Sequence, residues 1–316
     1  MTGQRGSMLG RWRRASGALS LGAVLAVPPD ATRGTMVDAV VQARATTPGE
    51  VTVVRDVAYG ADRKQRFDVY APKGVRNAPV ILMVHGGAWR IGDKRSKGVV
   101  ENKVARWSRA GIIVISVNYR MLPGTDPVEQ ARDVARALAA AQAHMAEWGG
   151  DPSRVVLMGH SAGAHLVALI DANPALATAL GARAWLGAVI LDSAALDIVY
   201  TMERPHAAFY DAAFGADRAY WREASPYHHL AAGARPLLMV CSSRRRDSCL
   251  AARRLATKAT SAGVRAEVLP VAKSHAAIDA QLGAPGAYTD RVEDFLASLD
   301  PSLARALNGR RGAGDR

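Results

Sequence analysis

Several features that would assign this chain to other classes of protein are missing from its sequence. The 316 residues contain two cysteines, no internal repeat and no low-complexity linker. No group of His, Cys, Asp and Glu has the spacing of a metal site, and no G-x-G-x-x-G motif follows a predicted strand. We therefore expect neither a metal nor another cofactor, and a chain of this length has room for one large domain.

Long hydrophobic runs are also missing. The most apolar N-terminal stretch, residues 15–27, is too short to span a membrane. It follows the basic residues 11–14 and has the length of a signal-peptide core, and no cysteine follows it that would indicate a lipid anchor. We expect residues 1–45 to be a leader with a signal peptide, and the protein to be exported to the periplasm or secreted. A cytoplasmic location is the alternative.

The charge balance is strongly basic, with 41 Lys and Arg against 28 Asp and Glu, a net charge of +13 and a pI near 10.2. The arginines are dispersed, with concentrations at both ends of the chain. No recognition helix, zinc spacing or aromatic-basic platform accompanies them. The sequence thus predicts no specific nucleic-acid partner, and it leaves the oligomeric state open.

Short buried strands alternate with helices through most of the chain. Two alternating apolar–polar segments come first, and continuous apolar runs then alternate with helical patterns. The predicted strands are 51–57, 65–70, 80–84, 112–117, 154–158, 184–191, 236–241 and 265–270, and the predicted helices are 97–110, 127–147, 162–173, 250–262 and 290–299. This order predicts an α/β fold: a mostly parallel, doubly wound sheet led by antiparallel strands. We expect one catalytic domain over 46–300, a small lid-like insert at about 200–230, and a flexible basic tail over 301–316.

The most informative motif is Gly159-His160-Ser161-Ala162-Gly163, which reads G-x-S-x-G between a predicted strand and a predicted helix. A serine at such a turn is held in a tight bend with its hydroxyl exposed. Ser161 is therefore a candidate nucleophile. The alternative is an ordinary glycine-rich turn.

A serine nucleophile needs a base, and the base needs an orienting acid. His275 follows the last predicted strand, and Asp247 follows the strand before it. The order Ser161, Asp247, His275 is that of α/β-hydrolase triads. Asp192 and Asp197 follow an earlier strand, a position from which some folds recruit the acid, and Asp197 is held in reserve.

The segment His85-Gly86-Gly87-Ala88-Trp89 follows a buried strand directly. Its glycines allow backbone N–H groups to point inward, where they can stabilise an oxyanion. We expect Gly87, Ala88 and Ala162 to be the donors, and His85 to hold the loop.

Cys241 and Cys249 stand eight positions apart on either side of Asp247. In an oxidising compartment they could form a disulfide, and in the cytosol they would stay reduced.

Taken together, HGGAW, the VNYR strand end at 117–120, GHSAGAH and the late Asp and His resemble the α/β-hydrolase superfamily over about residues 50–300. Within it the chain resembles hormone-sensitive-lipase-like carboxylesterases, kynurenine formamidase-like enzymes and bacterial feruloyl or acetyl esterases. HGGAW in place of HGGG favours the formamidase-like branch, and the N-terminal region lacks the long helical cap of the lipases.

The resemblance implies a serine hydrolase that cleaves short-chain or aryl carboxylic esters, which are small molecules, through an acyl-enzyme. The alternatives are an aryl formamidase acting on N-formyl kynurenine and, further off, a peptidase or an inactive binding protein with the same fold.

Overall fold

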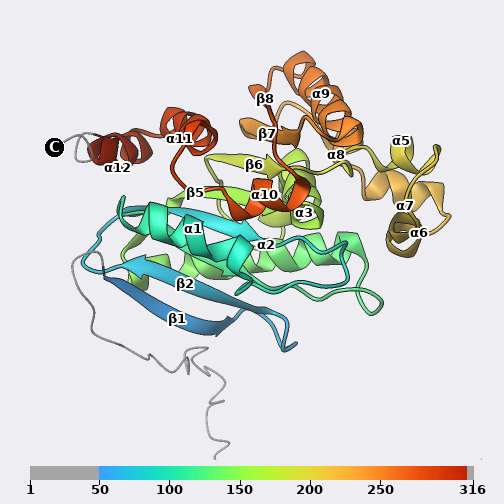
Figure 1. The fold of residues 1–316 in the computed structure, drawn as a ribbon. Coiled ribbons are helices and arrows are strands. Elements are labelled where there is room, and N and C mark those ends of the chain that lie inside the picture. Colours follow the sequence, from blue (N-terminus) through green and yellow to red (C-terminus); the bar gives the residue numbers. More distant parts are fainter. Residues whose placement is uncertain (1–49, 312–316) are drawn as a thin grey trace, which may run out of the picture. The chain divides into compact units, whose positions relative to one another are not determined.

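The computed structural model describes residues 50–311, and these form one compact unit. The expected leader and signal peptide lie outside the described residues. Figure 1 shows a central sheet with helices on both of its faces. The strands are β1 (Val51–Ala58), β2 (Arg66–Pro72), β3 (Ala78–Val84), β4 (Ile113–Val117), β5 (Gly150–His160), β6 (Gly187–Leu191), β7 (Leu237–Ser242) and β8 (Ala266–Val271).

The sheet has eight strands in the order β1-β2-β4-β3-β5-β6-β7-β8. β1 pairs antiparallel with β2, and β2 pairs antiparallel with β4. All other neighbours are parallel. The predicted fold class is confirmed, including the antiparallel leading strands.

Side chains of the central strands alternate between two cores. In β3, Val80, Leu82 and Val84 face one core, and Ile81 and Met83 face the other. Because both faces are covered, the strand is a continuous apolar run, as parallel strands typically are. The first core is closed by α2 (Pro127–His144), α3 (Ala162–Ala172) and α9 (Arg246–Ser261), and the second by α1 (Lys97–Ser108), α10 (His275–Ala280), α11 (Ala287–Leu299) and α12 (Pro301–Arg311).

The structure divides one predicted helix and adds a short helix after another. The 3-10 turn η1 (Met145–Trp148) ends the segment predicted as one helix over 127–147, and α4 (Pro174–Thr178) follows α3. Within residues 50–311, no helix is both long enough and apolar enough to cross a bilayer.

The C-terminal segment differs from the expected flexible tail. Residues 301–311 form α12, and its Leu303 and Leu307 are buried in the second core. Two leucines four positions apart lie on one face of a helix, which explains why this basic segment folds against the domain.

The expected insert is a set of four short helices between β6 and β7. They are α5 (Ile198–Met202), α6 (Ala208–Phe214), α7 (Arg218–Glu223) and α8 (Pro226–His229). We call residues 198–229 the cap. In Figure 1 α5, α6 and α7 lie beside the end of the sheet and away from α11 and α12.

Candidate active site

Ser161 occupies the turn between β5 and α3. Its backbone has φ 54° and ψ −116°, outside the regions that L-residues ordinarily adopt. Its N–H donates to the carbonyl of Leu191 at 2.9 Å, which ties the turn to the end of β6. A strained backbone held by its surroundings is typical of functional sites.

The two glycines of the motif are required by the packing of this turn. A Cβ atom on Gly163 would lie 2.4 Å from the carbonyl oxygens of Val84 and His85. A Cβ atom on Gly159 would lie 2.3 Å from the oxygen of Gly163. Only glycine allows α3 to approach β3 and β5 this closely.

His275 begins α10, directly after the loop that follows β8. Its Nδ1 lies 2.6 Å from Oδ2 of Asp192. Since a carboxylate can only accept, this contact assigns a proton to Nδ1, and none of the hydrogen bonds among the described residues uses Nε2. The side chains of Ser161 and His275 line the same cavity, whose volume is about 600 Å³. None of the hydrogen bonds among the described residues joins the two.

Asp192 follows β6 and is fully buried. Its Oδ1 accepts from the N–H of Ser242 at 2.8 Å and from the hydroxyl of Ser248. Burial alone would raise the pKa of this carboxyl, but the hydrogen bonds with His275, Ser248 and Ser242 and the charge of Arg245 outweigh it. The pKa of Asp192 is therefore held well below its usual range, and the group is an anion at neutral pH.

The expected pairing of His275 with Asp247 was wrong: the histidine pairs with Asp192 instead. α9 begins at Arg246 rather than at residue 250, so Asp247 lies in the first turn of a helix instead of in a loop. Its carboxylate accepts from the N–H of Ser248 at 2.8 Å and from Arg245 at 2.9 Å. The side chain is more than half exposed, and the carboxylate beside the histidine is that of Asp192.

Arg245 is a residue of this site that the sequence did not single out. Its Nη1 lies 2.9 Å from Oδ2 of Asp192 and 2.7 Å from Nδ1 of His275. A guanidinium therefore shares the carboxylate oxygen that the imidazole uses. The one signal that pointed here was the pair of cysteines on either side of this loop.

The two cysteines form a disulfide, the first of the two states that the sequence allowed, with a Cα–Cα distance of 5.0 Å. It joins the end of β7 to the first turn of α9. The loop that it closes contains Ser242, Arg245 and Ser248, which supply all the hydrogen bonds that the Asp192 carboxylate forms within residues 50–311 other than the one with His275.

The glycine loop after β3 lies against the serine. A Cβ atom on Gly86 would be 2.9 Å from Cβ of Ser161, and Gly87 has φ +120°. Gly87, Ala88 and Ala162 line the cavity of Ser161. No hydrogen bond formed among the described residues uses the N–H of Gly87 or Ala88, and Ala162 is the first residue of α3, where N–H groups have no intrahelical acceptor.

Histidines next to these motifs hold the loops together. His85 stacks on Tyr119 with ring centroids 4.6 Å apart, and the Tyr119 hydroxyl donates to the His85 carbonyl at 3.0 Å. Burial lowers the pKa of His165 to about 4, so its ring is neutral. His165 accepts from the indole of Trp89 at 3.2 Å and contacts the carbonyl of Ala224 in the cap at 2.7 Å.

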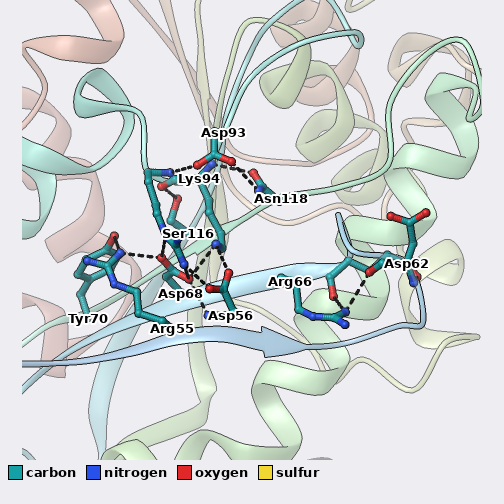
Figure 2. Close-up of polar contacts among 12 residues, drawn as sticks. Arg55, Asp56, Asp62, Arg66, Asp68, Tyr70, Asp93, Lys94, Ser116 and Asn118 are labelled. Carbon is teal, nitrogen blue, oxygen red and sulfur yellow. Dashed lines mark hydrogen bonds and ion pairs between the residues drawn. The ribbon is translucent and has the colours of Figure 1, made fainter. Parts of the chain in front are cut away.

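Charged side chains fix the segment that follows the glycine loop, as Figure 2 shows. Lys94 and Arg95 reach the buried carboxylate of Asp68 on β2 at 2.9 and 2.8 Å. The N–H of Lys94 donates to Asn118 at 2.7 Å, and Ser116 donates to the Lys94 carbonyl. Residues 91–93 and 96, which line the cavity, are thereby fixed on the sheet.

Aromatic residues close the cavity on the side of the cap. The ring of Trp89 contacts those of Phe209, Tyr210 and Phe214, with centroids 4.9 to 6.3 Å apart. Trp89 and Phe209 line the cavity, whereas Tyr119 lies beneath His85 and outside it.

The sheet order and the strained serine at the end of β5 define the α/β-hydrolase fold. Solved structures support this class: a truncated carbohydrate esterase from gut microbiota superposes with a TM-score of 0.68 at 20% identity, covering 78% of this chain and 96% of its own. Esterase 2 from Thermogutta terrifontis does so with a TM-score of 0.63 at 23% identity, covering 80% and 96%. The family model BD-FAE matches residues 67–246, more than half of the chain, and the chain belongs to this family.

Curated relatives match a shorter part. A probable isoprenylcysteine alpha-carbonyl methylesterase from Arabidopsis thaliana is 38% identical over 117 residues, 37% of this chain and 24% of its own length. A probable carboxylic ester hydrolase from Mycobacterium tuberculosis, LipM, is 34% identical over 143 residues, 41% of this chain and 33% of its own. The alignments thus span a third or less of these relatives.

Proposed function

We propose that this protein is a serine carboxylesterase that hydrolyses short-chain or aryl esters through an acyl-enzyme. The observation that carries the proposal is the Asp192–His275 contact in the cavity that contains the strained Ser161. The names of the relatives, an esterase in each case, support the same chemistry.

In this mechanism the Ser161 hydroxyl attacks the ester carbonyl while Nε2 of His275 takes its proton. The carbonyl oxygen becomes an anion and accepts hydrogen bonds from the N–H groups of Gly87, Ala88 and Ala162. His275 then gives the proton to the leaving alcohol. Water, deprotonated by His275, attacks the acyl-enzyme and releases the acid and Ser161. Asp192 orients the imidazole throughout.

The size of the site favours small substrates. The catalytic cavity of about 600 Å³ is of a size that holds small ligands, and the helices of the cap are short, so we expect short-chain or aryl esters to be the preferred substrates. A series of p-nitrophenyl esters of increasing acyl length tests this, and we expect kcat/KM to fall beyond the short chains.

Labelling with a fluorophosphonate probe tests the nucleophile. The wild type should be labelled and should hydrolyse p-nitrophenyl acetate, and Ser161→Ala should do neither. Ser261→Ala, an exposed serine on α9, is the matched control. An unlabelled wild type would contradict the proposal. Turnover of N-formyl kynurenine without ester hydrolysis would assign the site to an aryl formamidase instead.

We also propose that the protein is exported. The Cys241–Cys249 disulfide supports this, because structural disulfides persist in oxidising compartments. Fractionation of the producing cells tests it: activity confined to the cytoplasmic fraction would contradict it.

A further inference from the structure

A second cavity of about 760 Å³ adjoins the catalytic one. It lies between α5 and α6 of the cap and the first turns of α9. Ala194, Phe209, Tyr210 and Arg245 line both cavities, so the two share a wall. The second cavity therefore lies next to the cavity of Ser161, on the side of Arg245.

Basic side chains outnumber acidic ones in this second cavity. Arg254 pairs with Asp197 at 2.8 Å, and Arg245 pairs with Asp192 and Asp247, both at 2.9 Å. Arg204 and Arg246 also line the cavity, and no carboxylate of the described residues pairs with either. The four guanidinium groups of the cavity thus exceed the three carboxylates that pair with them, Asp192, Asp197 and Asp247, by one positive charge.

The position of Arg204 is fixed without loss of its charge. Its guanidinium carbon lies 3.6 Å from the ring centroid of Tyr200, and Nη1 donates to the Tyr200 carbonyl at 2.9 Å. Arg254 lies over the same ring at 4.0 Å. A cation held against an aromatic ring keeps its remaining N–H donors for an anion.

Exposed apolar side chains accompany this charge. The exposed large hydrophobic residues of the described chain are Ile91, Phe209 and Leu250, with 67%, 45% and 45% of their surface accessible. Ile91 lines the catalytic cavity, Leu250 the second one and Phe209 both. Both cavities therefore offer accessible apolar surface beside their polar groups, as ligand pockets commonly do.

We propose that the second cavity is a subsite for the anionic end of the substrate, so that the enzyme acts on esters that carry a carboxylate on an apolar or aromatic portion. The inference rests on the proposed esterase activity. The apolar portion packs on Phe209 and Leu250, and the carboxylate accepts hydrogen bonds from Arg204 and Arg246. Charge-assisted hydrogen bonds of this kind are stronger than neutral ones.

Matched pairs of esters with and without the charge test the subsite. For a carboxylate on the alcohol portion, the pair is 4-acetoxybenzoate and 4-acetoxybenzamide. For a carboxylate on the acyl portion, it is mono-4-nitrophenyl adipate and 4-nitrophenyl hexanoate. The quantity measured is the ratio of kcat/KM for the anionic ester to that for its neutral partner.

The double variant Arg204→Gln/Arg246→Gln should lower this ratio roughly tenfold for at least one pair. Salt at about 0.5 M should lower the wild-type ratio and leave that of the variant nearly constant. Arg253→Gln is the matched control, since Arg253 is exposed on α9 and does not line the cavity.

Three outcomes are distinguishable. A fallen ratio with an unchanged control supports the subsite, and the pair affected shows which portion of the ester enters it. Unchanged ratios for both pairs, or an equal fall in Arg253→Gln, overturn the subsite while the neutral esters are still cleaved. If the wild type does not hydrolyse the neutral esters at all, the proposed function itself is refuted.

Discussion

Oδ2 of Asp192 lies 2.6 Å from Nδ1 of His275, although the two residues follow β6 and β8, which are separated by β7. The other oxygen of the carboxylate accepts from the N–H of Ser242 at the end of β7, the strand between them. Three strands therefore meet at one carboxylate, and the imidazole is oriented by the sheet itself.

Asp192→Asn should lower kcat by roughly 10³- to 10⁴-fold, because an amide cannot hold the imidazole in the tautomer that leaves Nε2 free. The measurement is kcat for p-nitrophenyl acetate. Asp247→Asn is the matched control and should stay within a few-fold of the wild type, since Asp247 contacts Arg245 and the helix backbone rather than His275. A larger loss of kcat in Asp247→Asn than in Asp192→Asn would instead identify Asp247 as the residue that orients His275.

The carboxylate that pairs with His275 was not predicted correctly from the sequence. Asp192 and Asp247 both follow parallel strands and both lie between Ser161 and His275 in the chain. We expected the acid at Asp247 because it follows the strand directly before that of His275. The decision depends on where α9 begins, and a start at Arg246 turns Asp247 into a helix-terminal residue. Helix boundaries are the least reliable feature to predict from a sequence, and the first turn of α9 here contains the buried Ser248 and Cys249 of the disulfide.

Reduction of the disulfide should affect both stability and activity. The bond closes a short loop, and in the chain-entropy description this is worth about 2.5 kcal/mol of folding free energy. The same loop supplies Ser242, Arg245 and Ser248 to Asp192. We expect a thiol reductant to lower both the free energy of unfolding and kcat.

Denaturant titration and ester hydrolysis, each with and without the reductant, measure these two effects. The double variant Cys241→Ala/Cys249→Ala is the control, because it should have lower stability than the wild type and no further response to the reductant. Full activity of the reduced wild type would show that the loop keeps its contacts without the bond.

Gly87→Ala should lower kcat by at least 10²-fold, because the new Cβ atom would lie 1.9 Å from the carbonyl oxygen of Ile91 at a φ of +120°. The loop must move, and its N–H groups move with it. Gly124→Ala is the matched control, since a Cβ atom there has no neighbour within 4 Å. Equal kinetics of the two variants would remove Gly87 from the oxyanion site.

The strands and the strained turn at Ser161 could be predicted because their signals are local. Apolar runs such as 80–84 mark buried strands, and the glycines at 159 and 163 mark the close approach of α3. The helices of the cap and α12 were harder to predict from the sequence. The basic residues around 301–311 concealed Leu303 and Leu307, whose burial depends on α11 and β3 lying beside them.

The ionic cluster around Asp68 predicts how stability depends on pH. Burial would raise the pKa of Asp68, but hydrogen bonds from Arg95, Asp56, Arg55 and Lys94 lower it to about 2. A carboxyl whose pKa is lower in the folded than in the unfolded chain stabilises the fold above its unfolded pKa. That contribution, about 2 kcal/mol, is present near neutral pH and is lost as the pH falls from about 4 to about 2.

Asp68→Asn should therefore lower the free energy of unfolding by about 2–3 kcal/mol at neutral pH. The substitution also removes one of the two carboxylates among the described residues that pair with the buried Lys94, so that Asp56 remains. Urea titrations across the acid range measure the difference between wild type and variant, which should narrow as the pH falls below about 4. Glu101→Gln, an exposed acid on α1, should show neither the loss nor the narrowing. A difference that stays constant with pH would show that the charge of the Asp68 carboxylate does not contribute to the free energy of unfolding.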